Sequence, residues 1–426
     1  MALLKVNGFS CISQAEIQLK RLTVIIGPQA SGKSVLSKLI FFFNDIFSRQ
    51  FAFLEDEKPY SSFIATISED FKKWFPPSAW GSTKFVIRYE AGPVTLSITR
   101  RGSRSHLSDD VNIQITESFA ELYEQGLRQV RASRARLSRP EDDDTFVERE
   151  YESFWRIRES IELKNASFLG TDYVRTQTFV PAGRSFFTSI GKAIAAFDQS
   201  GMLDPVTVRF GRLFTTHRER GGRIFNRNLT SEEKTRQSDA MKSFFGGRIR
   251  IERDSEYIEA QDGRKVPFHI LSSGQQELLP LWMVIGSLAR KSTENRIIYI
   301  EEPEAHLFPS AQSLVVEYLA GLLSDNAPGR RMLITTHSPY VLSKINNLIR
   351  AGDLASRKRD RSPEIEKIIP KFSWMRSAHI QAYAILNGSV HPILDEDGLI
   401  DTEYLDAVSS DISDEFSRLL EIEVGE

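Results

Sequence analysis

Residues 22–36 read LTVIIGPQASGKSVL and decide the fold of the chain. The apolar and β-branched run LTVII indicates a buried strand. The glycine-containing segment 27–34 leads directly into VLSKLIFFFNDIF, whose apolar periodicity predicts a helix. A fully buried strand followed at once by a helix is typical of a parallel α/β sheet.

The loop between this strand and helix has the spacing G-x-x-x-x-G-K-[ST]. In such a loop, backbone N–H groups surround a phosphate at the positive end of the helix dipole. Lys33 is expected to reach the β- and γ-phosphates, and Ser34 to give Mg²⁺ a hydroxyl ligand. The residues predicted to bind ATP here are Gly27, Pro28, Gln29, Ala30, Ser31, Gly32, Lys33, Ser34 and Val35.

Two later apolar runs end in polar residues that complete such a site. RIIYIEE ends in Glu301 and Glu302, and RMLITTH ends in His337. ATP hydrolysis needs a carboxylate for the metal and another that polarises water, so Glu301 is predicted to support Mg²⁺ and Glu302 to be the base. His337 is predicted to contact the γ-phosphate. The alternative is that the acids cap a helix and the histidine is structural.

The stretch HILSSGQQELLPLW, residues 269–282, places small polar residues directly before an apolar helix. By itself it predicts a helix cap. A helix N-terminus with spare N–H groups and a hydroxyl is also suited to binding a phosphate.

The order of P-loop, LSSGQ, IEE and TTH resembles that of the ATP-binding-cassette (ABC) ATPases, whose signature has the form L-S-G-G-Q. In this sequence Ser273 replaces the first glycine of the signature. The resemblance implies a homodimer that sandwiches ATP head to tail, with rings of several dimers as a larger alternative. Ser272, Ser273, Gly274 and Gln275 would then bind the γ-phosphate held by the other subunit.

The 239 positions that separate Lys33 from Ser272 exceed the spacing of transporter ATPases and resemble the branch of SMC, RecF and OLD-like ATPases. IEEPEAHLFP and ITTHSPYVL are most similar to OLD-like ATPases and to ATPase subunits of the antiphage systems PARIS and Septu. FVPAGRS resembles the region of their glutamine-bearing loop, for which Gln177, Arg184 and Ser185 are candidates. Where these families usually have aspartate, Glu301 is one methylene longer and is expected to hold the metal through water.

The predicted fold is an α/β ABC-type ATPase head with a mostly parallel sheet, an antiparallel β subdomain and an inserted antiparallel helical arm. A segment rich in Glu, Arg, Ala and Leu, folding back at SRPEDDD, predicts the arm. Strands are also predicted at LLKV, AEIQL, KFVIRYEAGPVTLSITR, FVPAGRSFF and the 248–271 stretch. The predicted boundaries are 1–114 for the P-loop half, 115–167 for the arm, 168–350 for the signature half and 351–426 for a C-terminal region with an acidic tail.

Composition indicates a folded cytoplasmic protein. Apolar residues make up 41% of the chain, including 28 phenylalanines, which excludes a disordered protein. With Cys11 as its one cysteine, the chain has no internal disulfide, and a reducing compartment is expected. The sequence has no apolar run long enough to span a membrane and no signal peptide at its start.

Charge is distributed unevenly along the chain. Residues 393–426 carry a net charge of −11, and the rest of the chain +9. The tail is either a docking strip for a partner or a frayed, solvated end. The pattern Asp395-x-Asp397 resembles the metal site of the nuclease domain in OLD proteins, but the 89 residues after His337 are expected to be too few for that domain.

Three functions remain open at this stage. The first is an ATPase that senses a phage product and controls a separate effector, a nuclease or a toxin. The second is a RecF-like DNA-repair ATPase that grips DNA phosphates through residues 207–253, which contain 12 Lys or Arg against five acids. An ordinary solvated loop is the alternative for that segment. The third is a scaffold that binds ATP without turnover.

Overall fold

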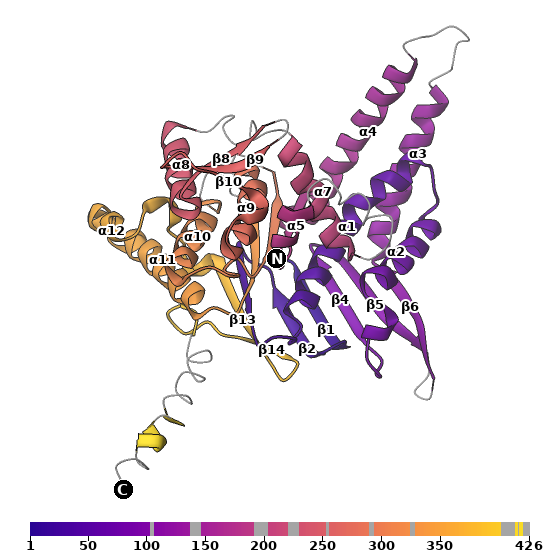
Figure 1. Cartoon of the computed structure of the whole chain (residues 1–426). Helices are drawn as coiled ribbons and strands as arrows, with labels where there is room; N and C mark the ends of the chain where they lie inside the picture. Colours follow the sequence, from indigo (N-terminus) through magenta and orange to yellow (C-terminus); the bar gives the residue numbers. More distant parts are fainter. Residues whose placement is uncertain are drawn as a thin grey trace.

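The computed structural model describes residues 1–102, 106–136, 146–190, 203–219, 230–252, 255–288, 294–323 and 329–401, with a few residues near the C-terminus. Within these ranges the core is an 11-stranded sheet in the order β6-β5-β4-β1-β2-β14-β13-β3-β12-β11-β7. Helices pack on the sheet, and a pair of helices projects away from it (Figure 1). The α/β class predicted from the sequence is confirmed.

One half of the sheet is parallel. β3 (Leu22–Ile26) lies beside β12 (Arg330–Thr336), followed by β11 (Arg296–Glu301) and β7 (Thr176–Val180). All five residues of β3 are buried, as a strand covered on both faces requires. Because the strands are parallel, their carboxyl ends lie at one edge, which is where α/β sheets bind ligands.

Two apolar cores cover the faces of this half. On one face Ile25 joins the core formed with α1 (Lys33–Glu55). On the other face Val24 and Ile26 join the core formed with α9 (Ser273–Leu288), α10 (Pro309–Gly321) and α11 (Pro339–Arg357). Successive side chains of β3 thus point to opposite faces of the sheet, and each face is covered by its own layer of helices.

The other half of the sheet is antiparallel. It contains β1 (Leu3–Phe9), β2 (Ile12–Gln18), β4 (Val86–Ala91), β5 (Val94–Gly102) and β6 (Leu107–Ile115). The predicted N-terminal strands and the hairpin around Gly92-Pro93 are confirmed. Two elements were not predicted from the sequence. They are β6, whose charged residues suit an edge strand, and α2 (Tyr60–Trp74), which buries a stripe of four apolar residues.

The segment FVPAGRSFF is only partly a strand. β7 ends at Val180, and α5 (Ser185–Ile190) follows after a short loop. Pro181 lacks the N–H group that the ladder needs, and Gly183 has a φ of +68°, so the prediction of continued β structure was wrong.

A small second sheet lies above α9. It is antiparallel and contains β8 (Gly247–Ile251), β9 (Glu256–Ala260) and β10 (Lys265–Pro267), as the sequence predicted. Two further helices, α7 (Pro205–Glu219) and α8 (Ser231–Phe245), precede it in the chain, and both pack on α9.

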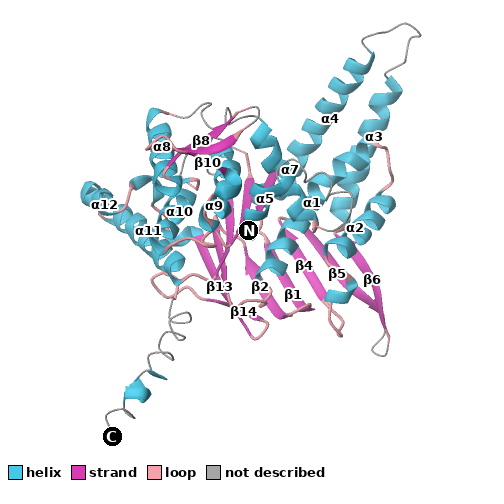
Figure 2. Ribbon diagram, in the orientation of Figure 1, coloured by secondary structure: helices cyan, strands magenta, loops and turns pink. Residues whose placement is uncertain are grey.

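The helical arm is confirmed. α3 (Glu117–Arg136) and α4 (Phe146–Leu169) pack against each other and project beyond the sheet (Figure 2). At the base of the arm Gly126 lets α3 approach closely, because a Cβ there would lie 3.1 Å from Leu54 and 3.2 Å from Ile161. The turn SRPEDDD lies outside the described residues. Among those described, no helix is long and apolar enough to cross a bilayer.

The chain after residue 350 returns to the central sheet. After α12 (Ser362–Ile368), β13 (Ile380–Leu386) pairs in parallel with β3, and β14 (Ser389–Pro392) connects it to β2. The main sheet therefore includes residues beyond position 350. Most of the acidic tail after residue 401 lies outside the described residues.

An ion-pair cluster joins α1 to α7. Arg209 donates two hydrogen bonds to Asp45, of 2.8 and 2.7 Å, and Arg49 donates one of 2.5 Å. Burial alone would raise the pKa of the Asp45 carboxyl, but the two arginines more than offset this, so that its pKa is lowered from 3.8. A lowered folded pKa stabilises the protein above the unfolded value and ceases to do so as pH falls through the folded value.

We expect Asp45→Asn to lower the free energy of unfolding by about 2 kcal/mol at pH 7, since charge-assisted hydrogen bonds are lost. The difference from wild type should begin to shrink below about pH 4, where the unfolded-state aspartate takes up a proton, and it should be lost as pH falls through the lowered pKa of folded Asp45. Urea unfolding at several pH values measures both effects. The control is Asp56→Asn, which affects a pair whose aspartate is 58% exposed and should change stability little. A pH-independent loss in Asp45→Asn would contradict the ionic explanation.

Candidate functional site

Three neighbouring strand ends bring the predicted catalytic residues together. Lys33 follows β3, Glu302 follows β11 and His337 follows β12. His337 lies between the other two: its Nδ1 is 3.4 Å from Lys33 Nζ, and its Nε2 is 3.1 Å from Glu302 Oε1. The structure thus places these three side chains in one line at the carboxyl edge of the sheet, while their roles stay predictions.

The P-loop is closed around the Lys33 side chain. Lys33 Nζ donates to the carbonyls of Gly27 (2.9 Å) and Pro28 (2.8 Å). Burial lowers the pKa of Lys33, and Glu302, Glu304 and Glu301 act against that shift. The ammonium therefore lies among backbone acceptors and carboxylates that compensate for its burial.

The loop has features that fit a phosphate. Gly32 has a φ of +104°, and a Cβ there would overlap Ile12 and Cys11. Ser31 Oγ is buried and has no hydrogen-bond partner among the described residues. Because a buried hydroxyl without a partner is costly, a phosphate oxygen at this position would satisfy it.

The predicted metal ligands suit Mg²⁺. Ser34 is exposed at the start of α1, and Glu301 is buried at the end of β11. Glu301 Oε1 accepts from Ser37 Oγ (3.2 Å), and its Oε2 accepts from the Ala182 N–H (3.3 Å). One hydroxyl and one carboxylate, completed by phosphate oxygens and water, form the kind of ligand set that Mg²⁺ uses in nucleotide enzymes.

Glu302 adopts a strained backbone. Its φ is +44°, a region that non-glycine residues rarely adopt. Its N–H donates to the Thr335 carbonyl (2.9 Å). The hydrogen bond from His337 is the largest influence on the Glu302 pKa and lowers it, against the effect of burial. The carboxylate is therefore held ionised, as a group that polarises water must be.

Glu304 also belongs to this site, although sequence analysis did not select it. Its Oε1 accepts from Thr336 Oγ1 (2.6 Å) and from the His337 N–H (2.9 Å). Its Oε2 is buried without a hydrogen-bond partner in the described part of the chain. In the sequence, Glu304 is the third acid of EEPE. A local pattern of this kind does not show that Glu304 contacts Thr336 and His337, which come from another strand.

We expect Glu304→Ala to lower the turnover number about 10- to 100-fold with little change in ATP affinity, because His337 would lose the acceptor that fixes its backbone. Glu304→Gln is the matched control, since its amide oxygen still accepts both hydrogen bonds and should retain most activity. Steady-state phosphate release measures turnover. A folded Glu304→Ala variant with wild-type turnover would exclude this role.

The signature segment caps α9. Ser272 Oγ accepts from the Gln275 N–H (3.4 Å), and the Gln275 amide oxygen accepts from the Ser272 N–H (3.3 Å). The predicted cap is thereby confirmed. Ser272 and Ser273 are exposed, while a Cβ on Gly274 would lie 2.6 Å from the His306 carbonyl oxygen. The exposed hydroxyls are therefore available to a second subunit, and the glycine packs on the loop after Glu302.

The candidates for the glutamine-bearing loop lie in different places. Gln177 Nε2 donates to the Phe41 carbonyl (3.1 Å), and Gln177 Oε1 accepts from the Tyr299 hydroxyl (3.1 Å). Phe41 lies eight residues beyond Lys33, about 12 Å along α1, so the structure places the Gln177 side chain away from the P-loop. Arg184 and Ser185, by contrast, lie beside Glu301 and the signature helix.

The Asp395-x-Asp397 pattern forms a turn. The Asp395 N–H donates to the Leu399 carbonyl (2.9 Å), and Asp395 Oδ1 accepts from the Leu399 N–H (2.8 Å). Asp397 lies 3.9 Å from Arg350. The two carboxylates thus serve local backbone and surface contacts, which explains the acidic spacing without a nuclease.

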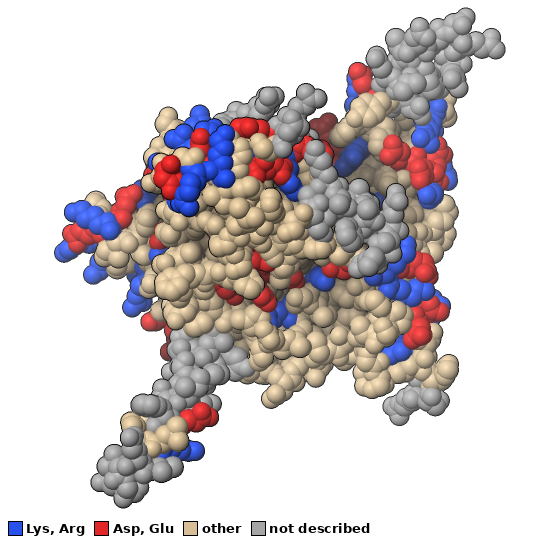
Figure 3. All heavy atoms as spheres, viewed as in Figure 1, with Lys and Arg blue, Asp and Glu red and all other residues tan. Residues whose placement is uncertain are grey.

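Many basic residues of the 207–253 segment have acidic partners. The pairs are Arg209–Asp45, Arg218–Glu256, Arg236–Glu232, Lys242–Asp239 and Arg250–Glu259. Basic and acidic atoms accordingly lie side by side over α8 and β8 (Figure 3). This arrangement favours the interpretation as a solvated surface, and DNA binding stays a prediction.

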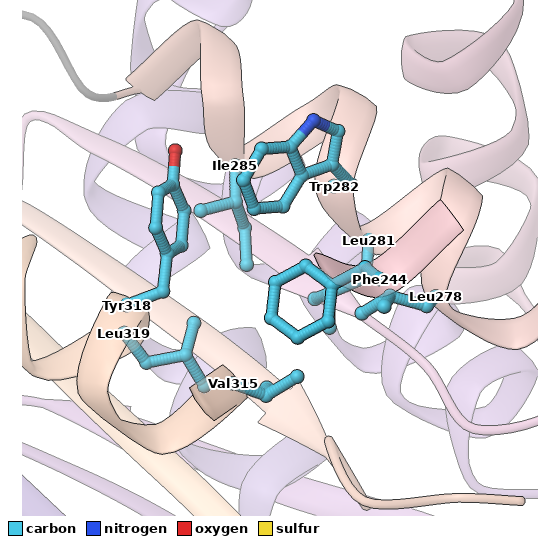
Figure 4. Close-up of a pocket in the computed structure, with 8 residues that line it drawn as sticks. All are labelled: Phe244, Leu278, Leu281, Trp282, Ile285, Val315, Tyr318 and Leu319. Carbon is cyan, nitrogen blue, oxygen red and sulfur yellow. The ribbon is translucent and has the colours of Figure 1, made fainter. Parts of the chain in front are cut away.

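A small apolar cavity lies apart from the phosphate site, between α8, α9 and α10 (Figure 4). The rings of Trp282 and Tyr318 are 4.5 Å apart at its wall. It is lined by Phe244, Leu278, Leu281, Trp282, Ile285, Val315, Tyr318 and Leu319. None of these lining side chains is charged, so the cavity offers nothing to neutralise a phosphate.

A family model described as "AAA domain, putative AbiEii toxin, Type IV TA system" (AAA_21) matches residues 22–343, more than half of the chain. The chain belongs to the AAA_21 family. The matched range includes every residue predicted for the ATP site of this AAA_21 protein. An ABC- and SMC-like P-loop ATPase is therefore supported, and the resemblance to PARIS and Septu in particular stays a prediction.

Several solved structures are similar to the AAA_21 chain in overall path. An SMC head domain from Thermotoga maritima is 15% identical, with a TM-score of 0.34, covering 92% of this chain and 99% of its own. An Smc head bound to the winged-helix domain of ScpA is 10% identical, with a TM-score of 0.42, covering 92% and 96%. An Smc head from Pyrococcus furiosus with an extended coiled coil, bound to the C-terminal domain of ScpA, is 13% identical, with a TM-score of 0.36, covering 97% and 100%. No curated relative matches the chain.

Proposed function

We propose that this AAA_21 protein is a cytoplasmic ATPase that slowly hydrolyses Mg²⁺-bound ATP at composite sites between two copies. In this proposal the ATP cycle controls a separate effector, a nuclease or toxin, in antiphage defence. The observation that most supports ATP hydrolysis is that His337 contacts both Lys33 and Glu302. The toxin and toxin–antitoxin wording of the family description supports the effector part.

The residues divide the reaction among themselves. Lys33 exchanges the carbonyls of Gly27 and Pro28 for the β- and γ-phosphate oxygens. Ser34 and Glu301 would hold Mg²⁺, which would neutralise phosphate charge. Glu302 polarises the attacking water, and His337 orients the Glu302 carboxylate while contacting the γ-phosphate.

A dimer is supported by what lies exposed around the site. Ile270 is 61% exposed just before the signature, Phe308 is 78% exposed after the Glu304 loop, and Tyr340 is 55% exposed after His337. The face over α9 and α10 shows few charged side chains (Figure 3). Apolar side chains gathered beside functional segments favour a protein interface. Rings of several dimers are compatible with this surface.

The effector proposal is tested by co-expression with the products of adjacent genes. The tagged wild-type protein should retain a partner in the presence of ATP, and the pair should protect cells from phage only when Lys33 is intact. Lys33→Ala is the matched control for nucleotide dependence. A chain that hydrolyses ATP, retains no partner and protects cells alone would overturn effector control and leave the ATPase proposal in place.

The DNA-repair alternative has its own test. Titration with duplex DNA at low salt should show binding that falls steeply as salt rises if residues 207–253 grip phosphates. Their acidic partners lead us to expect no such binding. Tight, salt-sensitive binding would favour the DNA-repair function over the effector function.

A further inference from the structure

Arg184 is completely buried, although its guanidinium carries a charge at any physiological pH. One end of the guanidinium reaches the strand that carries the site carboxylates. Its Nη1 donates to the Glu301 carbonyl (2.7 Å), and its Nη2 donates to the Glu302 carbonyl (3.0 Å). The same side chain therefore holds both backbone carbonyls that flank the turn at the end of β11.

Arg184 Nη1 also donates to the Pro181 carbonyl (3.1 Å), and further contacts of Arg184 reach the signature helix. Glu277 lies in the first turns of α9 and is 2% exposed. Arg184 Nε donates to the Glu277 carbonyl (3.1 Å), and the Glu277 carboxylate accepts from the N–H groups of Arg184 (2.8 Å) and Ser185 (3.1 Å). A continuous chain of hydrogen bonds thus runs from the signature helix to the carbonyls of Glu301 and Glu302.

This chain ends at a residue whose backbone is strained. A left-handed non-glycine residue persists only where its surroundings determine it. For Glu302 the backbone partners are Thr335, which accepts from its N–H, and Ala305 and Arg184, which both donate to its carbonyl. Without the guanidinium, the Glu302 carbonyl would keep the hydrogen bond from Ala305 but lose its link to the signature helix, and the Glu302 carboxylate would be held less firmly beside His337.

We propose that Arg184 is a positioning residue that holds Glu302 in its left-handed conformation, with Glu277 of the signature helix fixing Arg184 in turn. The guanidinium donates to backbone carbonyls of the site and lies 3.5 Å from the Glu277 carboxylate, so it reaches the reacting groups through the backbone of Glu302. The proposal rests on the proposed ATPase function. It predicts a selective loss of turnover, since the P-loop that binds ATP makes none of these contacts.

The test replaces both partners, because removing one would leave a buried charge uncompensated and unfold the site. Arg184→Met/Glu277→Leu removes both charges with similar volumes, and Arg184→Lys retains the charge without the fork. Arg330→Met is the matched control. Arg330 is another buried arginine (4% exposed), and its guanidinium donates to the Leu322 carbonyl. Arg330 is the first residue of β12 and so lies at the end of the strand away from the site.

In the folded double variant we expect the turnover number to fall about 100-fold and the ATP dissociation constant to change less than about 3-fold. Arg184→Lys should fall between this variant and wild type, and Arg330→Met should keep wild-type turnover even where its unfolding midpoint drops. Wild-type turnover in the folded double variant would overturn the proposal, and so would an equal loss in Arg330→Met. Wild-type protein and Lys33→Ala are assayed alongside. If wild type itself released no phosphate, the proposed ATPase function would fail instead.

Discussion

Glu302→Gln is expected to slow ATP hydrolysis about 1,000-fold, the middle of the range that a general base contributes, while ATP still binds. Glutamine has the same size as glutamate but cannot take a proton from water. The His337 contact and the left-handed backbone that place the side chain need no charge to persist. Single-turnover phosphate release and fluorescent-nucleotide binding measure the two steps separately.

The same variant should accumulate as an ATP-bound dimer, because assembly would proceed and the reaction that reverses it would not. Light scattering with and without ATP detects this species. Glu364→Gln serves as control, since Glu364 is exposed on α12 and pairs only locally with Arg361. If Glu302→Gln hydrolyses ATP at the wild-type rate, Glu302 is not the base.

Lys33→Ala and Ser273→Arg should each abolish hydrolysis, and an equimolar mixture of the two should recover about a quarter of wild-type activity. Half of the random dimers would be mixed, and each would have one intact site, with Lys33 from one chain and Ser273 from the other. Ser273 is exposed, so an arginine there blocks the phosphate without disturbing the core.

A control mixture tests whether recovered activity comes from a complete composite site or merely from one variant stabilising the other. Lys33→Ala mixed with the double variant Lys33→Ala/Ser273→Arg should stay inactive, because no pairing has an intact P-loop. Full activity of Ser273→Arg alone would show that the signature does not act across an interface. Failure of the first mixture to recover any activity would contradict the composite site as well.

The predicted site residues that the structure brings together are those that follow neighbouring parallel strands. Lys33, Glu302 and His337 each follow an apolar strand, and the carboxyl ends of neighbouring parallel strands must meet. The helical arm was predictable for a similar reason, since its composition changes abruptly at both ends. Both inferences needed only local patterns and one general rule of α/β sheets.

What sequence missed depends on register and on partners distant in the chain. The position of Gln177 could not be predicted, because the face to which a strand residue points depends on its parity within the strand, and the sequence does not give the ends of β7. Glu304 and Glu277 became visible only when their partners on β12 and in the 181–185 loop were known. β13 is the clearest case, since nothing local indicates that residues 380–386 lie beside residues 22–26.

The position of β13 beside β3 has a consequence for folding during translation: the P-loop lacks part of its support until β13 has been synthesised. The P-loop strand emerges from the ribosome early, but its neighbours β12 and β13 are made only after residues 330 and 380. The side chain of Ile385 packs against Gly27, only 3.2 Å from where a Cβ would lie. A nascent chain therefore carries a P-loop that lacks these neighbours until residue 386 has been made, and such non-local pairing is slow. Under the proposed function, chains still being translated would stay out of the ATP-dependent dimer.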